Sequence, residues 1–197
     1  MSRFHTDRDW TEFYKGAEED IPPDMPEPRG LSPDIIYYGD ADHAGDRKTR
    51  RSRTGYIIFL NMAPIIWFSK KQTTVETSVF GSEFMAMKQG MERITSLRYK
   101  LRMMGIPITD PAFMYGDNMA VIYNTSRPES TLKKKSNSVA YHYCRECVAK
   151  GMALTGHVAT NENPADICTK CIPGGEKRRH LCSYVLHYIY DFPKAES

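Results

Sequence analysis

Four acidic residues stand where the sequence predicts a strand end or the first turns of a helix: Asp40, Glu83, Asp117 and Asp166. In α/β folds ligands gather beyond the strand ends, and carboxylates from separate elements converge there only when a cation offsets their repulsion. An all-oxygen ligand set favours Mg²⁺ or Mn²⁺. Two such ions, about 3.5–4 Å apart, can activate a water and stabilise the leaving oxygen of a phosphodiester. Each acid taken alone is more simply a helix cap or a surface charge, so position alone does not establish a site.

The first three predicted strands follow one another along the chain. Residues 35–38 form a buried strand that ends at Gly39-Asp40, and residues 55–60 and 64–68 form two further strands joined by a turn at Asn61. Residues 78–104 then change period and predict a long amphipathic helix ended by Gly105 and Pro107. Its apolar stripe is Phe84, Met87, Met91, Ile94, Leu97, Leu101 and Met104.

The second half of the domain alternates between strands and helices. We expect a strand at 113–116, helices at 118–125 and 138–150, a strand at 153–158 and a helix that opens at Asn163-Pro164. Strands in succession followed by alternation indicate an α/β fold, a mixed five-stranded sheet with helices packed on it.

The N-terminal part of the chain has a different composition. Five prolines between residues 22 and 33 exclude a helix or a central strand there. We therefore interpret residues 1–33 as an acidic, proline-rich linker that tethers the domain to something outside this chain. The folded domain is expected at 34–175, and residues 176–197 are expected to form a C-terminal helical extension.

Composition narrows the class of protein. The longest uncharged stretch contains Asn61 and Pro64 and is shorter than the about 20 apolar residues of a membrane span, so we expect no membrane partner. The N-terminus lacks the apolar stretch of a secretory signal, and five cysteines are an odd count. We expect an intracellular protein with reduced thiols.

Basic residues are concentrated outside the first 30 positions, although the net charge is only +3. Three clusters predict contacts with nucleic-acid phosphates. Each cluster taken alone is explained equally well as a charged surface that is exposed to solvent and binds nothing. They are Arg47, Arg50, Arg51 and Arg53, then Lys70 and Lys71, and finally Lys133, Lys134 and Lys135.

The segments around the four acids carry a resemblance to a known family. They read YYGDADHAGD, SEFMAMKQG, MYGDNMAVI and NENPADICTK, in that order. These segments resemble the acidic motifs of the ribonuclease H domain in copia-type LTR retrotransposon polyproteins. Residues 49–84 and 130–147 also look like that family, so the resemblance covers roughly residues 10–190. It implies a ribonuclease H-like fold that follows a reverse transcriptase, with Asp40, Glu83, Asp117 and Asp166 as the catalytic, metal-binding set.

The resemblance also implies a function. The expected reaction is endonucleolytic hydrolysis of the RNA strand in RNA/DNA hybrids by two Mg²⁺ (or Mn²⁺) ions, with the reverse transcriptase domain of the same polyprotein as partner. Ser82, Asn118 and the main chain near Ala41 are candidates for contacts with the RNA 2′-hydroxyl. The expected location is a cytoplasmic retrotransposon particle with access to the nucleus. The alternative is an inactive relic or domesticated domain that binds nucleic acid or a partner without cutting.

Several other features are open to competing interpretations. Cys144 and Cys147, with Cys168 and Cys171, match the count of a four-cysteine zinc site, which would make a zinc-stabilised interaction domain. Both pairs lie in segments expected to be helical, which favours ordinary thiols. His157 precedes Asp166 by nine residues and either assists proton transfer or packs in its strand. Asp42 next to the first acid also stays open.

Overall fold

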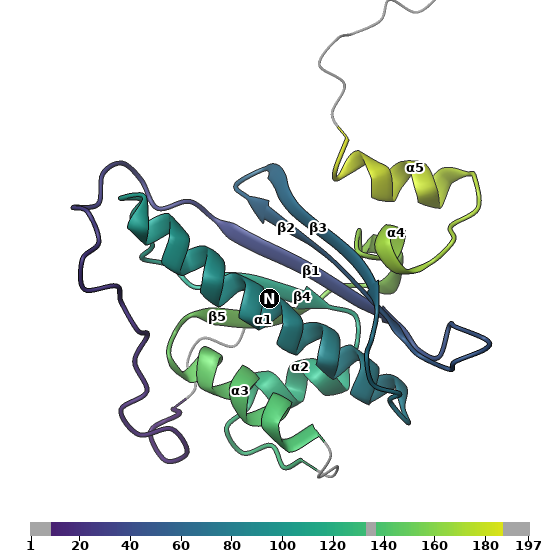
Figure 1. Cartoon of the computed structure of the whole chain (residues 1–197), viewed down its shortest axis with the longest axis horizontal. Helices are drawn as coiled ribbons and strands as arrows, with labels where there is room; N and C mark the ends of the chain where they lie inside the picture. Colours follow the sequence, from purple (N-terminus) through teal and green to yellow (C-terminus); the bar gives the residue numbers. More distant parts are fainter. Residues whose placement is uncertain (1–8, 133–136, 187–197) are drawn as a thin grey trace, which may run out of the picture.

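The fold is a mixed five-stranded sheet with helices on both faces (Figure 1). The computed structural model describes residues 9–132 and 137–186. The strands are β1 (Ile35–Asp42), β2 (Arg53–Leu60), β3 (Ala63–Lys71), β4 (Ala112–Gly116) and β5 (Ala153–His157). Their order is β3-β2-β1-β4-β5, with antiparallel pairing among β1, β2 and β3 and parallel pairing of β4 with β1 and β5. The predicted fold class is therefore confirmed.

Three helices cover one face of the sheet: α1 (Val79–Met103), α2 (Met119–Ser126) and α3 (Ser138–Ala149). Ser78 caps α1 by accepting a hydrogen bond from the Gly81 N–H at 3.1 Å. Most of the predicted apolar stripe of α1 is buried against β1, β2 and α3. The Tyr37 hydroxyl on β1 donates to the Ala86 carbonyl at 2.9 Å. A Cβ atom at Gly90 would lie 2.4 Å from the Tyr37 ring, so this glycine lets α1 approach the sheet closely.

The opposite face carries α4 (Asp166–Thr169) and α5 (Glu176–Ser183), which follow the short 3₁₀ helix η2 (Thr160–Glu162). Successive residues of a strand point to opposite faces. Tyr37 contacts α1, and Asp40, three positions later, contacts the end of α4. Asp40 thus lies at the boundary between the two helical layers.

Some boundaries differ from those expected from the sequence. β1 continues to Asp42, so Asp40 lies within the strand, because residues 35–42 all pair with β2. Helix α4 begins at Asp166 and not at Pro164, because Asn163 organises the turn before it. Its side chain accepts from the Ala165 N–H at 3.1 Å and donates to the Gly39 carbonyl at 2.9 Å. Both cysteine pairs were expected on helices, and this is wrong for Cys171, because α4 ends at Thr169.

Residues 9–29, called the N-terminal strap below, contain no helix or strand, as their prolines predict. The strap nevertheless contacts the domain, running past α1 and α3 (Figure 1). Glu19 receives hydrogen bonds from Arg98 and Arg102 at 2.6–2.8 Å. The Arg145 guanidinium of α3 lies 5.0 Å from the ring centroid of Trp10. The domain boundary near Asp34 stays a prediction. The interpretation of residues 1–33 as a linker did not predict these contacts with the domain.

No helix among the described residues is both long enough and apolar enough to cross a bilayer. Lys133, Lys134 and Lys135 lie outside the described residues, as does the last part of the expected C-terminal extension, from residue 187.

Candidate active site

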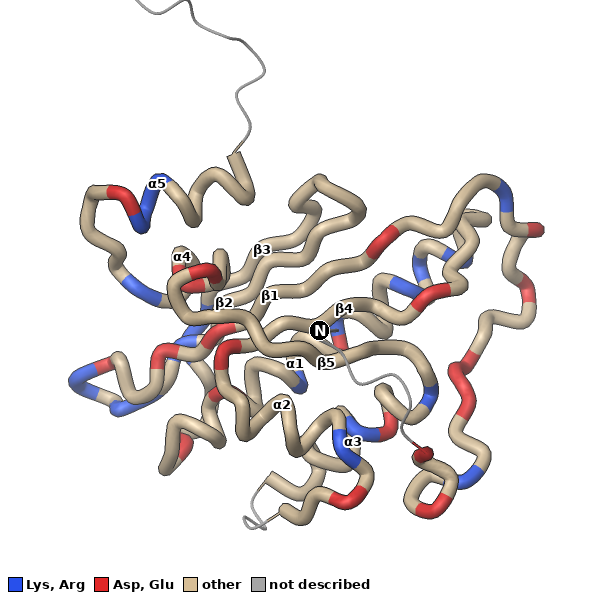
Figure 2. Tube along the Cα trace, turned by 180° about the vertical axis from the view of Figure 1, so that it is seen from behind, with Lys and Arg blue, Asp and Glu red and all other residues tan. Residues whose placement is uncertain are grey.

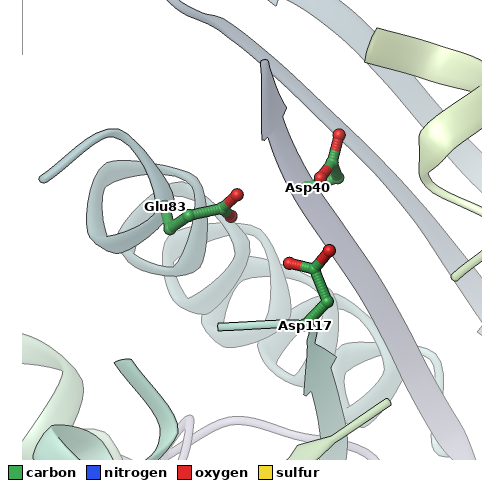
Figure 3. Close-up of side chains that lie close together, drawn as sticks. All are labelled: Asp40, Glu83 and Asp117. Atoms are coloured by element: carbon green, nitrogen blue, oxygen red, sulfur yellow. The ribbon is translucent and has the colours of Figure 1, made fainter. Parts of the chain in front are cut away.

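Three of the four predicted acids meet beside the end of α1. Asp40, Glu83 and Asp117 each offer an oxygen, and these oxygens lie within 4.8 Å of one another (Figure 3). Asp40 comes from β1, and Asp117 directly follows β4, the parallel neighbour of β1. Glu83 comes from the first turns of α1. The parallel pairing therefore sets two acids side by side, and the helix brings the third to them.

Two of the three carboxylates are buried, Asp117 is partly exposed, and the three groups repel one another. Asp40 is 1% exposed and Glu83 is 9% exposed. Burial raises the pKa of Asp40. Burial, followed by the charges of Asp40 and Asp117, raises the pKa of Glu83 to about 9. A divalent cation relieves both effects, and an all-oxygen ligand set suits Mg²⁺ or Mn²⁺, so these residues fit the predicted metal.

Asp166, the fourth predicted acid, does not belong to that group. Its side chain is fully buried, and its two oxygens accept from Lys170 at 2.7 Å and from Lys177 at 3.0 Å. Lys170 also donates to Asp40 at 3.1 Å, while Thr169 donates to the other oxygen of Asp40. The structure therefore joins Asp166 to Asp40 through an ammonium group. The role of Asp166 as a metal ligand stays a prediction.

Lys170 is charged in this environment. Burial alone would lower the pKa of Lys170, but the hydrogen bonds and charges of Asp166 and Asp40 raise it above its usual range. Sequence reasoning missed this residue. The signal was its position four residues after Asp166, where a helical turn brings two side chains together.

An open cleft lies over the three carboxylates and is also lined by Asp42, His43, Asn118 and Lys170. Asn118 caps α2 by accepting from the Ala120 and Val121 N–H groups at 3.0 and 3.3 Å, which leaves its amide N–H₂ for the cleft. Two predicted neighbours of the acids thus have defined places: Ala41 and Asn118 both line the cleft.

Ser82 does not reach this cleft as a nucleic-acid contact. It is fully buried, and its hydroxyl donates to the Val79 carbonyl at 2.9 Å. The same hydroxyl lies 3.4 Å from Nδ1 of His43. The first turn of α1 folds this side chain inward, so the structure gives no support to the predicted contact of Ser82 with nucleic acid. Its structural partner is His43, a residue that lines the cleft.

The loop between β1 and β2 carries the first basic cluster and projects from the domain (Figure 2). Asp46 organises the loop by accepting from the Lys48 and Thr49 N–H groups at 2.9 and 3.1 Å. The turn leaves the predicted arginines of the loop exposed to solvent: Arg47, Arg50 and Arg51.

The remaining described basic candidates lie on neighbouring strands. Arg53 on β2 donates to Ser69 at 3.1 Å, and the exposed Lys70 and Lys71 lie on β3. Lys71 pairs with Asp46 of the loop, so β3 also supports the loop conformation. This contact places the loop beside the end of β3, so the two described basic clusters are neighbours.

The other chemical candidates lie away from the carboxylates. Cys144 and Cys147 belong to α3 and are buried in the core, whereas Cys168 and Cys171 belong to the α4 side of the sheet. The sheet separates the two pairs, so they do not form one four-thiolate group. His157 ends β5 and is not among the residues that line the carboxylate cleft.

Comparisons with known proteins agree with this geometry. No family model matches the chain. A retrovirus-related Pol polyprotein from transposon RE1 of Arabidopsis thaliana is 34% identical over 142 residues, 72% of this chain and 10% of the polyprotein. The RNase H domain of a Mycobacterium tuberculosis protein has a TM-score of 0.55 at 11% identity, covering 78% of this chain and 96% of that domain.

The chain is a homologue of transposon Pol polyproteins and has the ribonuclease H fold. A second solved structure, LC11-RNase H1 in complex with an RNA/DNA hybrid, has a TM-score of 0.54 at 14% identity and covers 68% of this chain and 93% of that one. The resemblance and fold expected from the sequence are thus confirmed. The chain spans about a tenth of the length of the polyprotein relatives it matches.

Proposed function

We propose that this chain is a retrotransposon ribonuclease H, which cuts the RNA strand of RNA/DNA hybrids internally with the help of two Mg²⁺ or Mn²⁺ ions. The observation that carries the proposal is the convergence of Asp40, Glu83 and Asp117 in a ribonuclease H fold. A solved neighbour of the same fold holds an RNA/DNA hybrid, which supports this substrate class.

The protein groups have separate tasks in this reaction. When bound, the ions would lower the pKa of the attacking water and offset charge on the departing 3′ oxygen. Asp40, Glu83 and Asp117 would hold ions through their carboxylates, and Asp166 would complete the set. Because these acids are carried by strands and helices, the site would be rigid enough to hold the scissile phosphate in line with the attacking water.

Recognition of the hybrid would use two surfaces. The exposed arginines of the β1–β2 loop and the lysines of β3 would contact phosphates, which gives affinity without sequence preference. The Asn118 amide and the Ala41 main chain line the cleft beside the acids and would contact the RNA 2′-hydroxyl. The proposed partner is the reverse transcriptase domain of the same polyprotein, in a cytoplasmic particle.

The test is cleavage of a labelled RNA/DNA hybrid by the purified chain with Mg²⁺ or Mn²⁺. Asp117→Asn should abolish cleavage and retain hybrid binding, because it removes an ion ligand and one charge that repels phosphate. Asp110→Asn is the control and should cleave like wild type, since Asp110 is an exposed acid outside both the cleft and the three-carboxylate group. Single-stranded RNA and duplex DNA should remain uncut. Equal cleavage by wild type and Asp117→Asn would refute the site.

One observation favours the second candidate, a domain that binds hybrids without cutting them. Lys170 and Lys177 pair with both oxygens of Asp166. Measurable hybrid binding with no cleavage in either metal, including after fusion to the polymerase domain, would support that candidate.

A further inference from the structure

The space between Asp40 and Asp166 holds a positive charge from the chain itself. Lys170 directly follows α4, and its backbone N–H donates to the Asp166 carbonyl at 2.9 Å, which fixes the start of the side chain. Its Nζ lies 3.1 Å from Oδ1 of Asp40 and 2.7 Å from Oδ1 of Asp166. The position is therefore held from both ends, by the backbone and by two carboxylates.

The two carboxylates and the lysine differ in their access to the cleft. The Lys170 side chain is 37% exposed and lines the cleft, while Asp40 is 1% and Asp166 0% exposed. Asp166 does not line the cleft. The Lys170 ammonium group therefore stands between the cleft and Asp166.

The other half of the site differs: within residues 9–132 and 137–186, no lysine or arginine pairs with Glu83 or Asp117. Asp40, Glu83 and Asp117 approach one another within 4.8 Å, and their charges raise the demand for a cation there. Asp40 is shared between the two halves, with Oδ1 bonded to Lys170 and Oδ2 to Thr169.

We propose that the Lys170 ammonium is a built-in cation of this site, which makes the two divalent-ion positions unequal. The first ion binds at Asp40, Glu83 and Asp117 with Lys170 in place. The second ion binds between Asp40 and Asp166 and must displace the ammonium group. This inference rests on the proposed function, since it takes the four acids as the ligands of two ions.

The test is a titration of the metal-stripped chain with Mn²⁺. Binding is monitored through the electron paramagnetic resonance signal of the Mn²⁺ that remains free. Wild type should bind one Mn²⁺, with a second at least about tenfold weaker, because the ammonium group must first give up two charge-assisted hydrogen bonds. Lys170→Met should bind two Mn²⁺ ions with affinities within a few-fold of each other. Lys170→Arg should restore the unequal pattern.

Lys177→Met is the matched control. It removes the same charge from the same carboxylate, but Lys177 contacts the outer oxygen, Oδ2, and does not line the cleft. This variant should retain the wild-type pattern. An equal gain of a second ion in both methionine variants would overturn the proposal in favour of a general charge effect. Two equal ions in wild type would overturn it as well.

The folding of the variants is checked by their thermal midpoints, and Lys170→Gln supplies a second uncharged variant of similar length. Failure of this inference differs from failure of the proposed function. Unequal Mn²⁺ binding without hybrid cleavage would contradict the nuclease function but support the role of Lys170. Hybrid cleavage with two equally bound ions would support the nuclease function and contradict the role of Lys170.

Discussion

Two glutamates with little exposure to solvent sit in opposite electrostatic surroundings. Glu83 is 9% exposed and faces Asp40 and Asp117, so burial and these charges raise its pKa to about 9. The side chain of Glu19 is 12% exposed and lies between Arg98 and Arg102. Burial alone would raise the pKa of Glu19, but the hydrogen bonds and charges of the two guanidinium groups lower it to about 2.

The difference separates the proposed active site from a contact that supports the fold. Uncompensated charge in the active site costs stability and creates demand for a cation. Compensated charge in the strap satisfies two arginines that are themselves 2% and 7% exposed. The same residue type therefore has opposite consequences, and the sign is set by the neighbours that packing supplies.

The largest expected effect comes from Glu83→Gln. Hybrid cleavage should fall about 1000-fold, because the change removes an ion ligand worth several kcal/mol to the transition state. The metal-free variant should nevertheless be more stable than wild type by about 1 kcal/mol, since the folded state no longer has to protonate a buried acid whose pKa is raised to about 9. Cleavage rates and urea unfolding in EDTA measure the two effects. A metal-free Glu83→Gln variant less stable than wild type would contradict the contrast drawn between Glu83 and Glu19.

The next effect comes from Glu19→Gln in the strap. Two buried guanidinium groups would lose their carboxylate, so we expect a loss of about 3 kcal/mol in the free energy of unfolding. Urea unfolding measures it, and Glu18→Gln, a neighbouring acid of the same strap, is the control. A variant as stable as wild type would show that the strap is an incidental contact.

Metal addition should stabilise the wild-type chain by about 2.7 kcal/mol at an ion concentration 100 times its dissociation constant. Glu19→Gln should keep this increment, and Glu83→Gln should lose most of it. Thermal unfolding with and without Mn²⁺ compares the three proteins. Equal increments in all three would place the ion elsewhere.

The pH dependence of the strap follows from the lowered pKa of Glu19. The pKa falls from an ordinary 4.5 to about 2 on folding, so the stability from this carboxylate is complete above pH 4.5. It is lost as the pH falls from 4.5 toward 2. The stability gap between wild type and Glu19→Gln should therefore narrow over that window, as urea unfolding at several pH values would show. A gap independent of pH would mean that charge is not its cause.

The smallest effect concerns the exposed arginines of the β1–β2 loop, which contact neither Glu83 nor Glu19. Arg50→Ala with Arg51→Ala should leave stability unchanged and reduce the salt slope of hybrid binding by about 2, one for each lost phosphate contact. Binding titrations at several salt concentrations measure the slope. An unchanged slope would exclude this loop from the nucleic-acid interface.

Much of the fold was predictable because the signals are local. The stripe in α1 and the strand at residues 35–38 depend on spacings of two to four residues, which the sequence displays directly. The extension of β1 to Asp42 was not predictable in this way, since it depends on pairing with β2 across the sheet. Likewise, the inward turn of Ser82 depends on how the start of α1 meets His43.

The sequence by itself determined which acids exist, their order and the elements that carry them, and with them the family resemblance. Only the tertiary structure decided that Asp40, Glu83 and Asp117 meet while Lys170 separates Asp166 from them. It also decided that Glu19 pairs with Arg98, 79 residues away. The physical reason is that periodicity reports neighbours along the chain, whereas the distance between charges on different elements is fixed only when the sheet and its helices pack together.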